Sequence, residues 1–262
     1  MLGLARLGPR AALPPGGEGL YRHLARLAEL GPDREFLVVP CGQAAATEFL
    51  ARTTGAAGSG VDPDEGLVER ATERAKAAGL AERLHYEHAP LEDLPYQDAV
   101  FDVAIGDIGL AAAADVEAAV RELVRVTRPM GSVLLVQLVW TGNVSPERRQ
   151  AVEEHLGVRP LVLVEWKQLL RDAGVVELHV EDWADGAGDH RQRAALRGLV
   201  EFLSLRDRLE MLWRAGRQWG WRGVPAALAR DRQVRALLTR ERVLGLSVIK
   251  GTRWQAPPDA SP

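Results

Sequence analysis

Residues 36–62 read as one strand–helix–strand unit, and this segment constrains the fold more than any other part of the chain. Phe36–Cys41 is a continuous apolar run, as expected for a strand covered by helices on both faces. A tight turn at Cys41-Gly42 leads into a helical segment, and Ser59–Asp62 ends a second strand. Such a turn places backbone N–H groups and a helix N-terminus beside a ligand, and an acid about 20 residues further on can bind ribose hydroxyls. Asp62 has this spacing, so the segment predicts a nucleotide-type site.

Strands and helices continue to alternate after this unit. Further strands are expected at Arg83–His88, Phe101–Asp107, Ser132–Val139 (after a turn at Pro129–Gly131), Val175–Trp183 and Val243–Trp254. Helices are expected at Tyr21–Glu29, Ala44–Arg52, Asp64–Ala78, Asp115–Thr127, Pro146–His155 and Glu165–Ala173. This alternation with right-handed crossovers predicts an α/β fold with a doubly wound, mostly parallel, seven-stranded sheet. Ligands of such sheets bind beyond the carboxyl ends of the strands, where Gly42, Asp62 and Asp107 all fall.

The chain of 262 residues divides into a core domain and flanking segments. We expect a flexible tail at 1–18, an α/β domain at 19–184 and 243–254, a helical insertion at 185–242 before the last strand, and a second tail at 255–262. No apolar run approaches the roughly 18 residues of a membrane span, and the N-terminus lacks the apolar core of a signal peptide. The single cysteine excludes an internal disulfide and favours a cytoplasmic location.

Three segments resemble a known family when they are taken together. LEDLPYQDAVFDVAIGDIGL (91–110) resembles the pattern AExLPFxDxxFDxVxxxxxL, and VRELVRVTRPMGSVLLVQ (120–137) resembles ExxRVLKPGGxLxxx. Gly60–Leu67 resembles GVDxSxxML. These patterns occur in class I S-adenosylmethionine-dependent methyltransferases, especially the small-molecule branch that includes ubiquinone and menaquinone C-methyltransferases. The resemblance covers 34–183 and 243–254, and it implies a Rossmann-like methyltransferase fold with S-adenosylmethionine as cofactor.

The resemblance also implies roles for individual residues. Cys41, Gly42 and Gln43 match the loop around the methionine part of the cofactor, and Asp62 matches the acid that binds both ribose hydroxyls. Leu91 matches a position whose backbone N–H meets the adenine. Glu92, which follows it, is also expected to bind the cofactor, with a simple turn role as its alternative. Asp107 matches the residue after the fourth strand that faces cofactor and substrate.

Four positions depart from the family pattern. Val38 stands where an acid is usual, Pro40 and Ala44 replace the first and third loop glycines, and Pro90 aligns with the acid that recognises adenine. Proline removes an N–H and restricts φ, and the alanine methyl occupies space beside the loop. Each lost polar contact weakens binding by roughly 0.5–1.5 kcal/mol. Asp62 is therefore the main remaining side-chain anchor.

Methyl transfer from a sulfonium is an in-line displacement that needs little acid–base equipment when the acceptor is already nucleophilic. If a base is needed, Asp107 is our candidate, and a solvated or helix-capping acid is its alternative. His88 is better interpreted as a surface histidine at a strand end than as a base. Asp62 could instead cap the helix that begins near Asp64. Cys41 is better interpreted as a small turn residue than as a nucleophile.

The Trp/Arg-rich stretch 213–222 admits three interpretations: packing of the inserted helices, a lid over the substrate pocket, or a nucleic-acid surface. We favour packing and expect a small-molecule partner rather than nucleic acid. One cysteine and six scattered histidines give no metal-ligand spacing, so no metal is expected. The first hypothesis is methyl transfer to a small organic acceptor. Its alternatives are a non-catalytic protein that keeps the fold for binding or assembly, and an RNA methyltransferase that uses the basic insertion.

Overall fold

The computed structural model describes residue 13, residues 16–183 and residues 243–254. The expected helical insertion at 185–242 and the expected tail at 255–262 lie outside the described residues. So does most of the expected tail at 1–18. Within the described residues, every helix is too short or too polar to cross a membrane.

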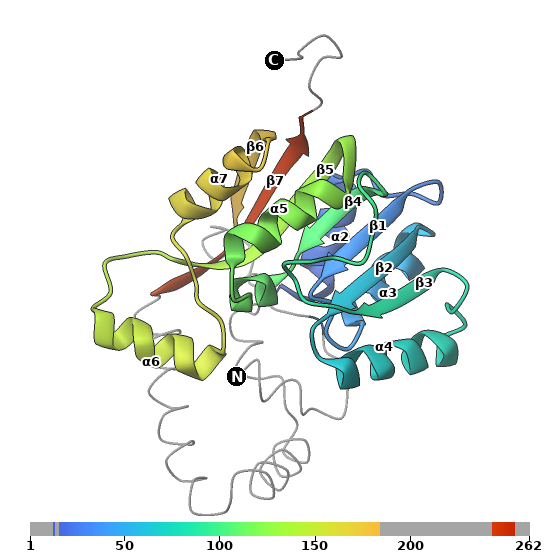
Figure 1. The fold of residues 1–262 in the computed structure, drawn as a ribbon, viewed down its shortest axis with the longest axis horizontal. Helices are drawn as coiled ribbons and strands as arrows, with labels where there is room; N and C mark the ends of the chain where they lie inside the picture. The colour runs from blue at the N-terminus through green and yellow to red at the C-terminus, as the bar shows by residue number, and fades with distance from the viewer. Residues whose placement is uncertain (1–12, 14–15, 184–242, 255–262) are drawn as a thin grey trace, which may run out of the picture.

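The described residues form one seven-stranded sheet with the strand order β3-β2-β1-β4-β5-β7-β6 (Figure 1). Strands β1 to β5 run parallel, and β7 runs antiparallel to both β5 and β6. The strands are β1 (Glu35–Val39), β2 (Ala57–Asp62), β3 (Leu84–His88), β4 (Phe101–Gly106), β5 (Thr127–Trp140), β6 (Val175–Asp182) and β7 (Leu244–Arg253). The order reverses between β1 and β4, which is where ligands of doubly wound sheets bind. The predicted α/β fold is confirmed.

Helices cover both faces of this sheet, with α2 and α3 on one face and α5 and α7 on the other (Figure 1). The helices are α2 (Gly17–Leu27), α3 (Ala45–Thr54), α4 (Glu65–Ala77), α5 (Val116–Val126), α6 (Pro146–Leu156) and α7 (Leu163–Asp172), with a 3₁₀ turn, η1 (Ile108–Ala112), after β4. The central strand β1 buries Phe36, Leu37 and Val38 completely. Val38 is thus a core residue at the position where the family usually has an acid.

Helix α2 begins at Gly17, four residues before the helix start expected at Tyr21 and two residues inside the segment expected as a tail. Leu20, Tyr21 and Leu24 are fully buried on one side of this helix, and their packing extends the order towards the N-terminus. Gly16 precedes the helix with φ 97°, and a Cβ there would lie 2.4 Å from the Leu20 side chain. The far end of α2 is attached to β7, because Lys250 Nζ donates to the Leu27 carbonyl at 2.7 Å.

The expected turn at Pro129–Gly131 is instead a bulge inside β5, which runs without a break from Thr127. Phe101 pairs with Thr127 and Val103 pairs with Ser132, so one residue of β4 faces four residues of β5. Extra residues on one strand are pushed out of the ladder while the pairing continues on both sides. Met130 absorbs the change of direction with φ 62°.

Candidate cofactor and active site

The loop after β1 keeps the backbone of a glycine turn although two of the usual glycines are replaced, by Pro40 and Ala44. Gly42 has φ 55° and Ala44 has φ 67°, both in the left-handed region. The Cys41 N–H donates to the Val61 carbonyl at 2.8 Å, and the Ala44 N–H donates to the Cys41 carbonyl at 3.1 Å. A left-handed alanine costs about 1–2 kcal/mol, so the packing around the loop imposes this conformation.

The side chains that replace glycines are accommodated inside the protein. The Ala44 methyl is buried, with 1% of the residue exposed. The Pro40 ring lies against η1, where a Cβ at Gly109 would come within 2.5 Å of Pro40 Cγ. A Cβ at Gly42, in contrast, would meet no heavy atom within 4 Å. The two replacements therefore leave open space beside Gly42.

Asp62 lies buried at the carboxyl end of β2 and braces this loop. Its Oδ2 accepts the Gly42 N–H at 2.9 Å, and its Oδ1 accepts the Asp64 N–H at 3.0 Å. The residue that caps α4 is Asp64, whose Oδ1 accepts the Leu67 N–H at 3.2 Å. The alternative interpretation of Asp62 as the helix cap was therefore wrong. Two backbone donors hold its carboxylate in one orientation.

Cys41 packs between β1 and β2. A Cβ at Gly60 would lie 2.5 Å from Cys41 Cβ, so only glycine leaves room for the cysteine side chain. Burial, and then the nearby Asp62 carboxylate, raise the pKa of the Cys41 thiol. A thiol that resists ionisation is a poor nucleophile, which supports the interpretation of Cys41 as a turn residue. Gln43 follows it at the half-buried tip of the loop.

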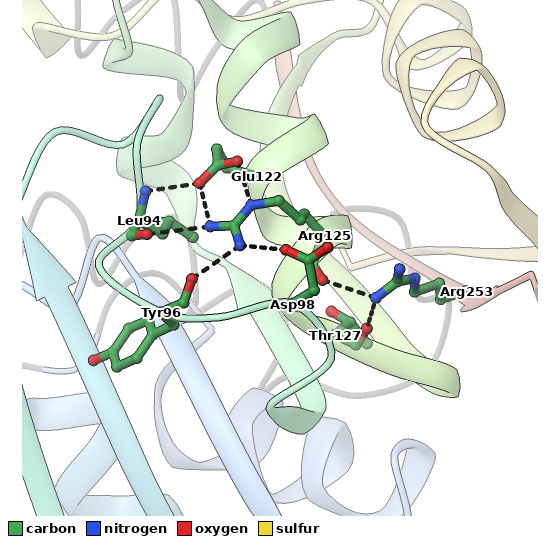
Figure 2. A network of polar contacts seen from close by, with 7 residues as sticks. All are labelled: Leu94, Tyr96, Asp98, Glu122, Arg125, Thr127 and Arg253. Carbon is green, nitrogen blue, oxygen red and sulfur yellow. Dashed lines mark hydrogen bonds and ion pairs between the residues drawn. The ribbon is translucent and has the colours of Figure 1, made fainter.

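The segment after β3 is held by helix α5 (Figure 2). Arg125 donates to the carbonyls of Leu94 at 3.2 Å and Tyr96 at 2.9 Å, and to the carboxylate of Asp98 at 2.7 Å. Glu122 accepts the Leu94 N–H at 2.8 Å and pairs with Arg125 at 2.6 Å. Hydrogen bonding from Arg125 holds the pKa of the Glu122 carboxyl below its usual value. We call Glu122 and Arg125 the loop clamp.

A second arginine connects the loop clamp to strand β7. Arg253 of β7 donates to the main-chain carbonyls of Arg125, at 2.8 Å, and of Thr127 (Figure 2). The loop clamp itself joins the two family-like segments 91–110 and 120–137. The sequence patterns indicated both segments but not the contacts between them. The spacing of Glu122 and Arg125, three residues apart on a predicted helix, was the one feature of the sequence that pointed to their ion pair.

Leu91 and Glu92 lie directly before the clamped residues. The Leu91 side chain is buried, and among the described residues no backbone carbonyl accepts its N–H. Glu92 Oε1 accepts the Asp115 N–H at 3.1 Å and so helps to begin α5, while Asp115 caps that helix. Glu92 therefore has a structural contact of its own, in agreement with the turn role considered for it.

Asp107 follows β4 next to the cofactor loop, since its N–H donates to the Val39 carbonyl at 2.8 Å. Its Oδ2 accepts the Tyr21 hydroxyl at 2.5 Å, and its Oδ1 accepts the Ile108 N–H at 2.7 Å. Gln137 Nε2 donates to the Asp107 carbonyl at 2.9 Å. Sequence reasoning missed Tyr21, which is 86 residues away along the chain.

The environment of Asp107 changes its acidity. The residue is 4% exposed, so the alternative of a solvated acid was wrong, whereas its contact with Ile108 does make it the cap of η1. Burial raises the pKa of Asp107 to about 6, although the hydrogen bonds from Tyr21 and Ile108 partly oppose this. His88, the other base considered, is exposed on β3 with its ring 3.2 Å from the Pro63 carbonyl, as expected for a surface histidine.

Comparison with known sequences identifies the family. Residues 37–135 match the model of a methyltransferase domain. An uncharacterized protein of Haemophilus influenzae is 32% identical over 65% of this chain and 69% of its own length. The 27-O-demethylrifamycin SV methyltransferase of Amycolatopsis mediterranei is 29% identical over 66% of this chain and 65% of its own. The methyltransferase GfsG of Streptomyces halstedii is 28% identical over 54% of this chain, which spans 51% of GfsG.

Solved structures share the fold at low sequence identity. The [4+2]-cyclase SpnF has a TM-score of 0.71 at 21% identity, over 91% of this chain and 82% of its own. A putative sarcosine dimethylglycine methyltransferase from Galdieria sulphuraria has a TM-score of 0.72 at 14% identity, over 92% of this chain and 85% of its own. Sheet order, matched domain and relatives agree, and the chain belongs to the methyltransferase-domain family, as a class I S-adenosylmethionine-dependent methyltransferase of type 11.

Proposed function

We propose that this enzyme transfers a methyl group from S-adenosylmethionine to a small organic acceptor, with Asp107 as the base. The observation that carries the proposal is the buried Asp107 carboxyl, which lies next to the loop that follows β1. Burial raises the pKa of this carboxyl to about 6. A carboxyl that is kept ionisable at an energetic cost to the fold marks a functional position. S-adenosylmethionine, when bound, supplies a methyl group on a sulfonium, which leaves as the neutral thioether.

The residues around the loop fit this cofactor. The left-handed Gly42, with open space on its free side, allows a ligand to approach the backbone closely. Asp62 is held at the end of β2, where a carboxylate can accept hydrogen bonds from hydroxyl groups. The Leu91 N–H and the backbone of Cys41 and Gln43 complete the proposed set. Since Val38 and Pro90 replace acids, affinity for the cofactor would rest on Asp62 and on backbone groups.

Asp107 suits an acceptor whose nucleophile carries a proton. A general base works best when its pKa lies near the operating pH, and a pKa of about 6 leaves most of this carboxyl ionised at neutral pH. Asp107 would accept the proton of an acceptor hydroxyl or acidic C–H as the new bond to the methyl carbon forms. The name of the Amycolatopsis relative, 27-O-demethylrifamycin SV methyltransferase, describes methylation of an oxygen on an organic acceptor and supports this substrate class. The cytoplasmic location, the absence of a nucleic-acid partner and the cap role of 185–242 stay predictions.

Transfer of an isotope-labelled methyl group tests the proposal. The full chain is incubated with labelled S-adenosylmethionine and, separately, with phenols, hydroquinones, aliphatic alcohols and total RNA. We expect label in one of the small hydroxyl-bearing acceptors and a loss of at least 100-fold in rate for Asp107→Asn. Label in RNA alone would contradict the small-acceptor proposal. An unchanged rate in Asp107→Asn would contradict the role of this residue as the base.

A further inference from the structure

Tyr21 joins the first described helix to the end of β4. Its side chain is fully buried between Leu20 and Leu24 on the sheet-facing side of α2. A buried tyrosine hydroxyl needs a hydrogen-bond partner, and this one has a carboxylate, Asp107 Oδ2, at 2.5 Å. Burial, and then the Asp107 charge, raise the pKa of Tyr21 well above its usual value, so the hydroxyl keeps its proton and remains a donor.

The other elements that surround this carboxylate contribute neutral groups. Oδ1 accepts the Ile108 N–H from η1, while the end of β1 contacts the Asp107 main chain through the Val39 carbonyl. From β5, Gln137 donates to the main-chain carbonyls of Gly106 and Asp107. Within the described residues, Tyr21 is thus the titratable group that acts on the Asp107 carboxyl. Removal of the Tyr21 hydroxyl should therefore change the ionisation of Asp107, with no other titratable side chain as intermediary among the described residues.

The direction of this effect follows from elementary electrostatics. Burial favours the neutral carboxyl, because an ion loses its hydration there, whereas a donor to the charged form favours ionisation. The hydrogen bond from Tyr21 lowers the pKa of Asp107 and limits the rise that burial causes. With Phe at position 21, the hydrogen bond that opposes the effect of burial would be lost and the pKa of Asp107 would rise further. A large fraction of the Asp107 carboxyls would then hold a proton at neutral pH.

We propose that Tyr21 is a positioning residue for methyl transfer, and that its hydroxyl keeps the Asp107 carboxylate ionised and holds it in one orientation. This inference rests on the proposed function of Asp107 as the base. The Tyr21 hydroxyl contacts Asp107 and not the loop after β1, so we expect its removal to change the affinity for cofactor little. The two oxygens have separate donors, one from α2 and one from η1. Removal of the Tyr21 donor frees the carboxyl to rotate as well as to accept a proton.

Infrared difference spectroscopy of the ligand-free protein tests this directly. The carboxyl band of Asp107 is assigned by comparison with Asp107→Asn and is then followed against pH. We expect Tyr21→Phe to raise the midpoint by at least about one pH unit, which is a tenfold change in the ratio of neutral to ionised carboxyl. Tyr86→Phe is the matched control, since it removes a hydroxyl bonded to Thr47 at 2.7 Å, and it should leave the midpoint unchanged.

Fluorotyrosine provides a second variant that keeps the side chain in place. The chain has three tyrosines, so in a Tyr86→Phe, Tyr96→Phe background the label reports on Tyr21 alone. A more acidic phenol is a stronger donor, and it should lower the Asp107 midpoint. An unchanged midpoint in both Tyr21 variants would overturn the proposal for Tyr21.

The acidic limb of the methyl-transfer pH profile separates the two proposals. In Tyr21→Phe this limb should move to higher pH together with the infrared midpoint, while the affinity for S-adenosylhomocysteine stays within about twofold. A shifted midpoint with an unmoved limb would contradict the base role of Asp107, and with it the part of Tyr21 in the reaction. An unshifted midpoint with a rate that still depends on Asp107 would contradict the Tyr21 proposal alone.

Discussion

Asp107→Asn is expected to raise the free energy of unfolding at about pH 7 by 2–3 kcal/mol while it removes methyl transfer. The pKa of this carboxyl rises from 3.8 to about 6 in the folded protein. Each pKa unit corresponds to about 1.4 kcal/mol, so the buried anion lowers the stability at neutral pH. An asparagine can accept the Ile108 N–H with Oδ1 and donate to the Tyr21 oxygen with Nδ2, and it carries no charge.

The pH dependence of this gain follows from the sign of the pKa shift. The folded protein holds the Asp107 proton more tightly than the unfolded chain, because its pKa is raised. The contribution of Asp107 to stability is therefore fully present below the unfolded value of 3.8 and is lost as the pH rises through about 6. The gain from Asp107→Asn should accordingly be large at about pH 7 and fall towards zero at about pH 4.

Urea denaturation at both pH values measures this difference. Asp115→Asn is the matched control, since Asp115 is also a helix-capping acid, with an exposed side chain that accepts the Ala118 N–H at 2.9 Å. It should change the free energy of unfolding by less than about 0.5 kcal/mol at either pH. A lower free energy of unfolding for Asp107→Asn at about pH 7 would contradict this prediction, because it would show that ionised Asp107 stabilises the fold.

Arg125→Ala is expected to lower the free energy of unfolding by about 2–4 kcal/mol. The substitution removes the donor to two carbonyls and to Asp98, and it leaves the half-buried Glu122 without its arginine. The segment that carries Leu91 then loses its attachment to α5. We therefore expect the affinity for S-adenosylhomocysteine to fall by at least about tenfold as well.

Arg121→Ala is the matched control, one turn earlier on the same helix. Its side chain is 55% exposed, against 30% for Arg125, and it pairs with Glu117 across one helical turn. Such surface pairs contribute about 0.3–0.5 kcal/mol. Amide hydrogen exchange should accelerate in 91–98 for Arg125→Ala and remain unchanged for Arg121→Ala. Equal exchange in the two variants would contradict the role of the loop clamp.

The fold was predictable because local patterns carry it. The apolar runs and turn residues of β1, β2 and β4 depend on neighbours in sequence, and the alternation of strands with helices leaves few topologies. The bulge in β5 was not predictable in this way, because proline and glycine, here Pro129 and Gly131, are common both in turns and in bulges. Pairing of β5 with β4 on both sides of the bulge, and with β7 from Ser132 onward, decides between them.

The site was predictable in position and less so in contacts. Gly42, Asp62 and Asp107 do lie at the carboxyl ends of β1, β2 and β4. The sequence near Ala44 does not indicate a left-handed backbone, which surrounding packing imposes on it. The partners that matter most come from distant segments: Tyr21 for Asp107, and Arg125 for the segment after β3. A single sequence does not report such pairs, since no local spacing links them.

Calorimetric titration of the full chain with S-adenosylhomocysteine tests the central claim, that a loop with Pro40 and Ala44 in place of glycines still forms a cofactor site. We predict saturable binding with a Kd of about 1–100 μM, and an affinity at least about tenfold lower for Asp62→Asn with its fold verified by circular dichroism. Absence of measurable binding to the unmodified chain at about 1 mM ligand would contradict the account.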